Sequence, residues 1–374
     1  MDPAQEPSSQ NLTPPNPPTL DAGTQIKKLE DLIANARMPE DLAQSARAMT
    51  ARLRVVQNQV SFYTEYDTIS RYITWICAIP WNKPSKDILD LEHARQILDK
   101  NHYGLGAVKD HILEYLAIMI LTRQKETAGS KDIIARSPIM SLVGLAGVGK
   151  TSVSYSIAEA LGRKIERIPF GGLGSASQLR GKSRLYSDSE PGMIVKALKR
   201  AGTSNPVILL DEIDRVSSEA VSDVMGVLVE VLDPTQNKAF LDHFIDYPVD
   251  LSQVLFIATS NNTKNISTAV LDRLEIIQMP SYTDEEKIVI GKTYVLPQIM
   301  RESGLDANEF EIADEVWPEV IVRPLGYDPG IRGLQRVLQS AVRKTVYLML
   351  MGKIQKGQKF IINNTNAKTF VSEW

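Results

Sequence analysis

The sequence predicts an α/β fold in which a helical segment precedes a parallel five-stranded sheet and a helical lid follows it. Short apolar runs alternate with helical patterns through the middle of the chain, which is typical of a mostly parallel sheet covered by helices on both faces. After Pro280 the strand signals largely stop. The strand-like runs occupy 138–144, 164–170, 206–211, 253–260 and 274–280. Helical spacing marks 90–100, 105–126, 283–301, 309–322 and 330–351, and a short strand is expected at 358–363.

The same pattern divides the chain into four parts. The first part holds six prolines and almost nothing apolar, so it cannot offset the entropy of ordering and is expected to be a disordered tail. The second part is expected to be helical, because Ile26, Leu29 and Ile33 share one helix face. The predicted parts are the tail at 1–25, the helical segment at 26–88, the large α/β domain at 89–281 and the small helical domain at 282–374.

The composition argues against several function classes. The 374 residues carry a formal net charge of -3, which does not favour a general nucleic-acid or membrane-surface binder. Cys77 is the one cysteine, so no internal disulfide can form. There is no apolar run of roughly 18 residues and no signal sequence, so a cytoplasmic protein is expected. The four histidines lack metal-ligand spacing.

The segment GLAGVGKT at 144–151 has the spacing of the Walker A phosphate-binding motif. Glycines let the backbone curl so that its N–H groups face phosphate oxygens, and a following helix adds its positive N-terminal dipole. Lys150 is expected to contact the β- and γ-phosphates of ATP, and the Thr151 hydroxyl to bind Mg²⁺. The alternative, a chance glycine-rich turn, does not account for the strand before the motif and the helix after it. The predicted nucleotide-binding residues are Gly144, Gly147, Val148, Gly149, Lys150, Thr151 and Ser152.

Two acidic residues end the strand PVILLDEID at 206–214, which has the Walker B pattern. Ligands of open α/β sheets bind at the carboxyl ends of the strands, where these residues are expected to lie. Asp211 is predicted to hold Mg²⁺, and Glu212 to act as the general base on the attacking water. A strand ending in a solvated acidic turn is the alternative, which the preceding Walker A motif disfavours. Asn261 ends the next strand, and the residues alone leave open whether it orients water or starts a turn.

Longer stretches extend the pattern beyond the two motifs. They are MPEDL at 38–42, IPW at 79–81, HYGLGAVKDHILEYLA at 102–117, GGLGSASQLRGKSRLYSDSEPG at 171–192, EVLDPTQNKAFLDHFIDYPVDLSQVLFIATSN at 230–261, LDRLE at 271–275 and GIRGLQR at 330–336. With these stretches the chain resembles Lon proteases, and specifically their AAA+ ATPase part, from about residue 26 onward. The resemblance implies an AAA+ P-loop NTPase fold that uses ATP and Mg²⁺.

The resemblance also implies roles for three polar side chains. Asn261 matches the sensor-1 asparagine, and Arg273 matches the arginine finger that reaches the γ-phosphate in a neighbouring subunit. Arg332 matches the sensor-2 arginine of the lid, which contacts the bound nucleotide. From the residues alone, both arginines read as solvated or salt-bridged surface side chains. Because a finger acts on a neighbour, the resemblance implies a homo-oligomeric ring, by family a hexamer.

The resemblance also implies residues that contact the adenine base of ATP and a polypeptide substrate. His102 and Tyr103 lie where the family lines the adenine pocket, and Tyr186 matches the pore-loop aromatic that grips a translocating polypeptide. Ser187 stands beside it where the family usually has an aliphatic residue. No GPSAG-like serine motif occurs, so peptidase activity is not expected from this chain alone, and a separate peptidase could be a partner.

Three functions are compatible with these residues. The first is an ATP-driven motor that remodels or unfolds polypeptides. The second is the ATPase part of an ATP-dependent protease. The third is a nucleotide-dependent assembly switch that binds a partner without threading it. Tyr186 favours the first two, and Ser187 favours the third.

Overall fold

The computed structural model describes residues 21–127, 139–186, 188–306, 308–354 and 359–371. The tail predicted at 1–25 therefore lies almost wholly outside the described residues, as does Ser187. The chain divides into two compact units, Met1–Trp81 and Asn82–Trp374. Among the described helices, none is both long enough and apolar enough to cross a membrane.

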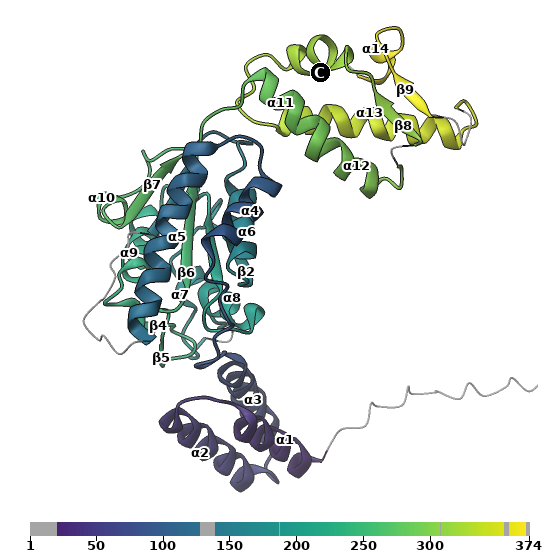
Figure 1. Cartoon of the computed structure of the whole chain (residues 1–374). Helices are drawn as coiled ribbons and strands as arrows, with labels where there is room; N and C mark the ends of the chain where they lie inside the picture. The colour runs from purple at the N-terminus through teal and green to yellow at the C-terminus, as the bar shows by residue number, and fades with distance from the viewer. Residues whose placement is uncertain (1–20, 128–138, 187, 307, 355–358, 372–374) are drawn as a thin grey trace, which may run out of the picture. The chain divides into compact units, whose positions relative to one another are not determined.

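The first unit is helical, as its apolar spacing predicts, and its described residues form three helices (Figure 1). These are α1 (Ala22–Asn35), α2 (Glu40–Val56) and α3 (Phe62–Ala78). The α1 residues Ile26, Leu29 and Ile33, which share one face, are all buried. The indole N–H of Trp81 donates to the Ile76 carbonyl oxygen at 2.7 Å, which fixes the chain after α3.

The second unit is built on a five-stranded sheet with strand order β2-β3-β6-β1-β7. All neighbouring strands run parallel. The five apolar runs predicted to be strands are therefore confirmed. Their bounds are β1 (Ile139–Val143), β2 (Ile165–Pro169), β3 (Val207–Asp211), β6 (Leu255–Ser260) and β7 (Leu274–Gln278). Because all five point the same way, the residues that follow β1, β3 and β6 meet at one edge of the sheet.

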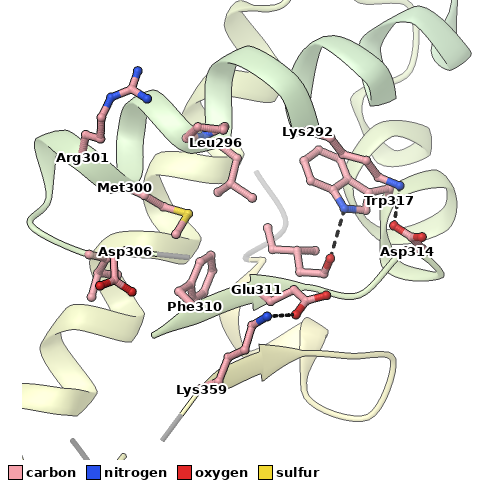
Figure 2. Close-up of a pocket in the computed structure, with 13 residues that line it drawn as sticks. Lys292, Leu296, Met300, Arg301, Asp306, Phe310, Glu311, Asp314, Trp317 and Lys359 are labelled. Atoms are coloured by element: carbon pink, nitrogen blue, oxygen red, sulfur yellow. Dashed lines mark hydrogen bonds and ion pairs between the residues drawn. The ribbon is translucent and has the colours of Figure 1, made fainter. Parts of the chain in front are cut away.

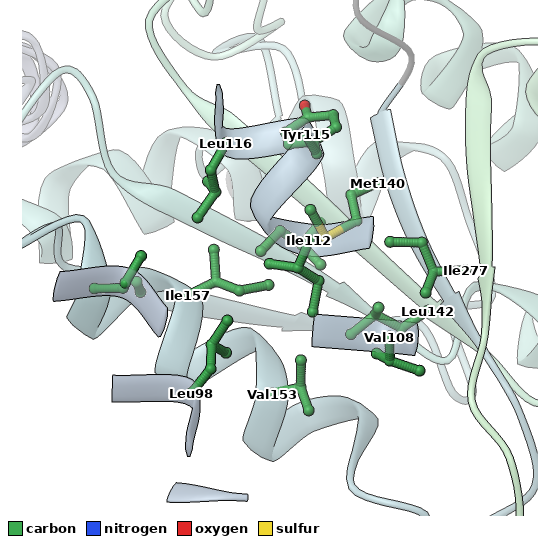
Figure 3. Close-up of a cluster of buried hydrophobic side chains, with 14 of the residues drawn as sticks. Leu98, Val108, Ile112, Tyr115, Leu116, Met140, Leu142, Val153, Ile157 and Ile277 are labelled. Atoms are coloured by element: carbon green, nitrogen blue, oxygen red, sulfur yellow. The ribbon is translucent and has the colours of Figure 1, made fainter. Parts of the chain in front are cut away.

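Helices α4 (Leu91–Asn101), α5 (Gly106–Thr127) and α6 (Lys150–Ala160) pack together against the sheet. Figure 3 shows their contact layer, in which Leu98, Ile112 and Ile157 come from the three helices and meet Leu142 of β1. This core anchors α6, which begins directly after the phosphate-loop sequence, so the loop is attached to a rigid base. The remaining elements of this domain are α7 (Ser177–Arg180), α8 (Met193–Ala201), α9 (Val221–Leu232), α10 (Thr268–Leu271), β4 (Phe240–Leu241), β5 (Pro248–Val249), and short 3₁₀ turns at Ile213–Arg215 and Asn237–Ala239.

The C-terminal part is mainly helical, as predicted. The expected helix at 283–301 forms with a π-helical turn in its middle, and the expected long helix at 330–351 is α13. Its elements are α11 (Asp284–Ile290), the π turn Gly291–Val295, α12 (Leu296–Glu302), β8 (Phe310–Ile312), the π turn Trp317–Val322, the 3₁₀ turn Arg323–Leu325, α13 (Arg332–Leu350), β9 (Phe360–Ile362) and α14 (Ala367–Phe370).

One prediction in this part is wrong at its start. Residues 309–322 were expected to be a helix, but Phe310–Ile312 form the strand β8. Phe310 and Ile312 are buried while Glu311 between them is exposed, which is the alternation of a strand. The strand forms because β9, the strand predicted at 358–363, pairs with it in parallel.

Candidate nucleotide site

The loop between β1 and α6 adopts a conformation that its sequence demands. Gly147 has φ 87° and Gly149 has φ 95°, both in the left-handed region that disfavours residues with a Cβ atom. Helix α6 starts at Lys150, so its free backbone N–H groups face the loop. The curled loop and the helix N-terminus together form a phosphate cradle.

The ammonium group of Lys150 points back into this cradle. It donates to the carbonyl oxygens of Gly144 at 2.6 Å and Leu145 at 3.0 Å, and to the side-chain oxygen of Asn261 at 3.0 Å. The side chain is largely buried. Burial lowers the pKa of Lys150, and the carboxylate of Asp214 acts in the opposite direction. The structure thus brings together the lysine and the asparagine that the sequence predicted for the γ-phosphate.

Asp211 lies at the end of β3, where the sequence predicted it. Its Oδ1 accepts from the Thr259 hydroxyl at 2.5 Å and lies 3.5 Å from the Thr151 hydroxyl. Its Oδ2 accepts from Arg167 Nε at 2.6 Å. A hydroxyl and a carboxylate are hard oxygen ligands of the kind that Mg²⁺ prefers, so Thr151 and Asp211 fit the predicted metal.

Glu212 adopts an unusual backbone conformation, with φ 57° and ψ 51°. Non-glycine residues seldom enter this left-handed region, and such residues concentrate at functional sites. The Glu212 N–H donates to the Thr259 hydroxyl at 2.9 Å, and its Oε2 lies 3.4 Å from Arg215 Nη1. The turn therefore presents the Glu212 side chain at the sheet edge directly beside Asp211.

Asp214 holds the turn that follows β6. Its Oδ2 accepts from the backbone N–H groups of Asn261 at 3.1 Å and Asn262 at 3.3 Å. These bonds fix the backbone of Asn261, whose side chain meets Lys150. Sequence reasoning missed this residue and also missed Arg167 and Thr259. For Asp214, its place directly after the Asp211–Glu212 pair was an available signal.

The histidine predicted for the adenine pocket is buried against α6. His102 Nε2 lies 2.9 Å from the hydroxyl of Ser156, and Lys109 Nζ donates to the His102 carbonyl oxygen at 2.7 Å. Burial, with the Lys109 charge second, lowers the pKa of His102 to about 4. His102 is therefore a neutral imidazole at pH 7. Tyr103 is 41% exposed, so its ring is accessible to a ligand.

The lid contacts the phosphate loop through one backbone and one side-chain hydrogen bond. Ile331 N–H donates to the Gly147 carbonyl oxygen at 3.2 Å, and the Tyr282 hydroxyl donates to the Val148 carbonyl oxygen at 3.1 Å. A Cβ atom built on Gly330 would lie 2.5 Å from the carbonyl carbon of Gly147, so only glycine fits there. Arg332 is exposed, and its Cγ lies next to Gly147. The predicted sensor arginine is thus beside the loop.

Arg273 is placed differently. Its Nη2 lies 3.0 Å from Asp233 Oδ2, and its Nη1 donates to the Ala269 carbonyl oxygen at 2.8 Å. Hydrogen bonds from Thr235 and then the Arg273 guanidinium hold the pKa of Asp233 well below its usual range. In the described part of the chain, Arg273 forms no ion pair or hydrogen bond with the phosphate loop.

The predicted pore-loop tyrosine lies in a surface loop. Tyr186 is 63% exposed and Leu185 is 93% exposed. The buried carboxylate of Asp242 fastens the base of this loop by accepting from Gly192 N–H at 2.7 Å. The exposed aromatic ring is therefore presented from an ordered base.

A separate pocket lies in the C-terminal helical part (Figure 2). Its volume is about 480 Å³, and Leu296, Met300, Phe310 and Trp317 give it an apolar lining. None of the predicted nucleotide-site residues lines it. Among the described residues, no cluster of three or more His, Cys, Asp or Glu side chains could hold a metal ion.

Comparison with known proteins identifies relatives over most of the chain. Residues 140–282 match the family described as "ATPase family associated with various cellular activities (AAA)". The Lon protease of Lawsonia intracellularis is 40% identical over 334 residues, covering 89% of this chain and 39% of that protein. The Lon protease of Aquifex aeolicus is 41% identical over 327 residues, covering 87% of this chain and 39% of that protein. Lon protease 2 of Thermus thermophilus is 42% identical over 288 residues, covering 76% of this chain and 36% of that protein. The chain thus spans about two fifths of the length of these relatives.

Proposed function

Because the chain carries an AAA ATPase domain related to that of Lon proteases, we propose that it binds and hydrolyses Mg-ATP. The observation that carries this proposal is the convergence of Lys150 and Asn261, whose Nζ and Oδ1 atoms lie 3.0 Å apart within the phosphate cradle. In ATP hydrolysis the γ-phosphoryl oxygens gain negative charge, so a positioned cation and an amide beside them are the groups that the reaction requires.

Each residue of the site has a proposed role in ATP binding or hydrolysis. Backbone N–H groups of the loop and Lys150 bind the phosphates, and Arg332 approaches them from the lid. Asn261 orients the attacking water, and Glu212 takes its proton. Thr151 and Asp211 would hold Mg²⁺, which neutralises phosphate charge when it is bound. His102 and Tyr103 lie at the adenine side.

The active assembly is proposed to be a homo-oligomeric ring, by family resemblance a hexamer. The support is that, among the described residues, Arg273 forms no ion pair or hydrogen bond with the phosphate loop of its own chain, as a residue acting on a neighbouring subunit requires. A ring also gives Tyr186 a function, because exposed aromatic side chains around a central pore can grip a polypeptide. We propose polypeptide remodelling as the use of this ATPase.

A second candidate is favoured by the similarity to Lon proteases. The chain would then act as the ATPase part of an ATP-dependent protease, with peptidase activity supplied elsewhere. An assembly switch that does not thread its partner is the third candidate, and exposed Tyr186 and Leu185 count against it because a switch needs no gripping surface.

The test measures phosphate release with Mg²⁺ and with excess EDTA, followed by unfolding of a tagged fluorescent protein. We expect Mg²⁺-dependent ATP hydrolysis and ATP-dependent loss of fluorescence, with the second lost in Tyr186→Ala while hydrolysis is kept. Absence of hydrolysis in the wild type would exclude the ATPase function. Hydrolysis without unfolding would favour the switch.

A further inference from the structure

A single buried hydroxyl, that of Thr259, lies between the two acidic residues of the nucleotide site. We propose that Thr259 is a positioning residue for ATP hydrolysis, which orients both Asp211 and Glu212. The proposal rests on the proposed function, because it gives a role within the same site. Thr259 itself is expected to touch neither nucleotide nor water.

The direction of the two hydrogen bonds supports this role. Thr259 is fully buried, and its Oγ1 donates to Asp211 Oδ1 at 2.5 Å. The same oxygen accepts from Glu212 N–H at 2.9 Å. A hydroxyl has one proton and can donate once while accepting elsewhere. A carboxylate can only accept and an amide N–H can only donate, so both bonds have a fixed direction.

The sheet places this hydroxyl where it can act. Strands β3 and β6 are parallel neighbours in which Leu210 pairs with Ala258, so Thr259 lies alongside Asp211 in the next register position. Asp211 Oδ1 is also the oxygen that faces Thr151 at 3.5 Å. The hydrogen bond from Thr259 therefore fixes the orientation of the Asp211 carboxylate relative to Thr151, the other predicted metal ligand.

The bond to Glu212 acts on the backbone. Glu212 has φ 57° and ψ 51°, a conformation that a non-glycine residue keeps only when its surroundings hold it there. Its N–H is held by Thr259, on a strand packed into the centre of the sheet. Without the hydroxyl, the turn can relax and the Glu212 carboxylate moves with it. Loss of the Thr259 hydroxyl is thus expected to disturb both the predicted metal ligand Asp211 and the predicted general base Glu212.

The test compares Thr259→Val, which keeps the shape and removes the hydroxyl, with Thr259→Ser, which keeps the hydroxyl and removes the methyl group. Two quantities are measured: kcat and KM for ATP, and the gain in affinity for a fluorescent ADP that Mg²⁺ produces. For Thr259→Val we expect kcat to fall at least about tenfold, a part of the roughly 10²- to 10⁴-fold that a positioned general base contributes, with KM little changed. The Mg²⁺ effect on ADP affinity should shrink, and Thr259→Ser should restore both.

The matched control is Ser260→Ala on the same strand. The Ser260 hydroxyl is also fully buried and has no hydrogen-bond partner among the described residues, so its loss should change neither quantity. If Thr259→Val does not fold, Thr259→Ala is compared with Thr259→Ser in its place. Wild-type behaviour in a folded hydroxyl-free variant overturns the proposal, as does equal impairment of the serine variant. If the wild type does not hydrolyse ATP, the proposed function fails, and the Mg²⁺ effect on ADP affinity still decides whether Thr259 orients Asp211.

Discussion

The guanidinium of Arg273 forms a 3.0 Å ion pair with the carboxylate of Asp233. Asp233 is itself held by two hydrogen bonds from Thr235 at 2.9 Å and 2.6 Å. The arginine is therefore fixed by a carboxylate that is already ordered. If Arg273 acts on a neighbouring subunit as proposed, this order reduces the conformational entropy that its side chain would lose there.

Arg273→Ala is expected to leave ATP binding nearly intact and to slow turnover by about 10³-fold, the low end of arginine-finger effects. The reason is that the finger stabilises charge that develops only in the transition state. The measurement is single-turnover hydrolysis together with ATP affinity at several protein concentrations. Specific activity of the wild type should rise with protein concentration. A concentration-independent rate would contradict the ring.

Mixing two inactive variants provides a second test of whether Arg273 acts on a neighbouring subunit. Rings that combine Arg273→Ala with an excess of Glu212→Gln contain interfaces in which an intact Arg273 faces an intact Glu212. Some activity should therefore return, compared with either variant alone. If mixing restores nothing although both variants assemble together, Arg273 does not act in trans.

Lys150→Ala should abolish ATP binding or weaken it greatly, because the phosphates lose a charged donor in a largely buried site. The measurement is titration with a fluorescent ATP analogue. Lys287→Ala provides a control, since Lys287 is also a buried lysine of the same unit but pairs with Asp284 in the lid. Affinity close to wild type in Lys150→Ala would refute the assignment of the phosphate loop.

Glu212→Gln should bind ATP normally and turn it over slowly. The amide keeps the shape of the side chain but cannot take a proton, so the loss should fall on kcat with KM largely unchanged. A positioned general base contributes about 10²- to 10⁴-fold, which sets the expected loss. Turnover within about twofold of wild type would exclude Glu212 as the base.

Acidification should destabilise the protein through His102. Its pKa is about 4 in the folded chain, below the ordinary value of about 6.5, so the unfolded chain binds a proton first. The stabilisation is therefore present above pH ~6.5 and is lost progressively as pH falls toward about 4, by at most about 3 kcal/mol.

Urea unfolding at several pH values tests this expectation in the wild type and in His102→Gln. The glutamine can keep a hydrogen bond to Ser156 but does not titrate. As the pH is lowered, the free energy of unfolding of the wild type should therefore fall more steeply than that of His102→Gln. His93→Gln serves as the control, because His93 lies on α4, the helix that ends directly before His102. Parallel pH profiles for the wild type and His102→Gln would show that His102 does not titrate in this way.

Most of the fold could be predicted because its signals are local. Each central strand is a short apolar run, and helices such as α1 and α13 repeat their apolar residues at helical spacing. The strand β8 was missed because Phe310–Ile312 is too short to show its own period and depends on a partner at Phe360–Ile362. The π turn at Gly291–Val295 left no recognisable signal either.

The site could be predicted only where a motif fixes its spacing. Lys150, Asp211 and Glu212 belong to two local motifs, and the structure places them at one sheet edge. Thr259 reads as an ordinary β-branched strand residue, and its importance depends on which strand lies beside it. Arg167 comes from the outer strand β2, and only the strand order β2-β3 brings its side chain to Asp211.

The close approach of Gly330 to Gly147 has a mechanical consequence. Helix α13 begins two residues after Gly330 and has 19 residues, so it is a rigid rod of about 28 Å. Its base is attached to the loop that would hold the phosphates. A rigid rod turns as a whole, so any rotation of α13 at this contact would displace its far end the most. A single methyl group at residue 330 would force the base of this rod away from the loop, because its carbon would lie 2.5 Å from the Gly147 carbonyl carbon.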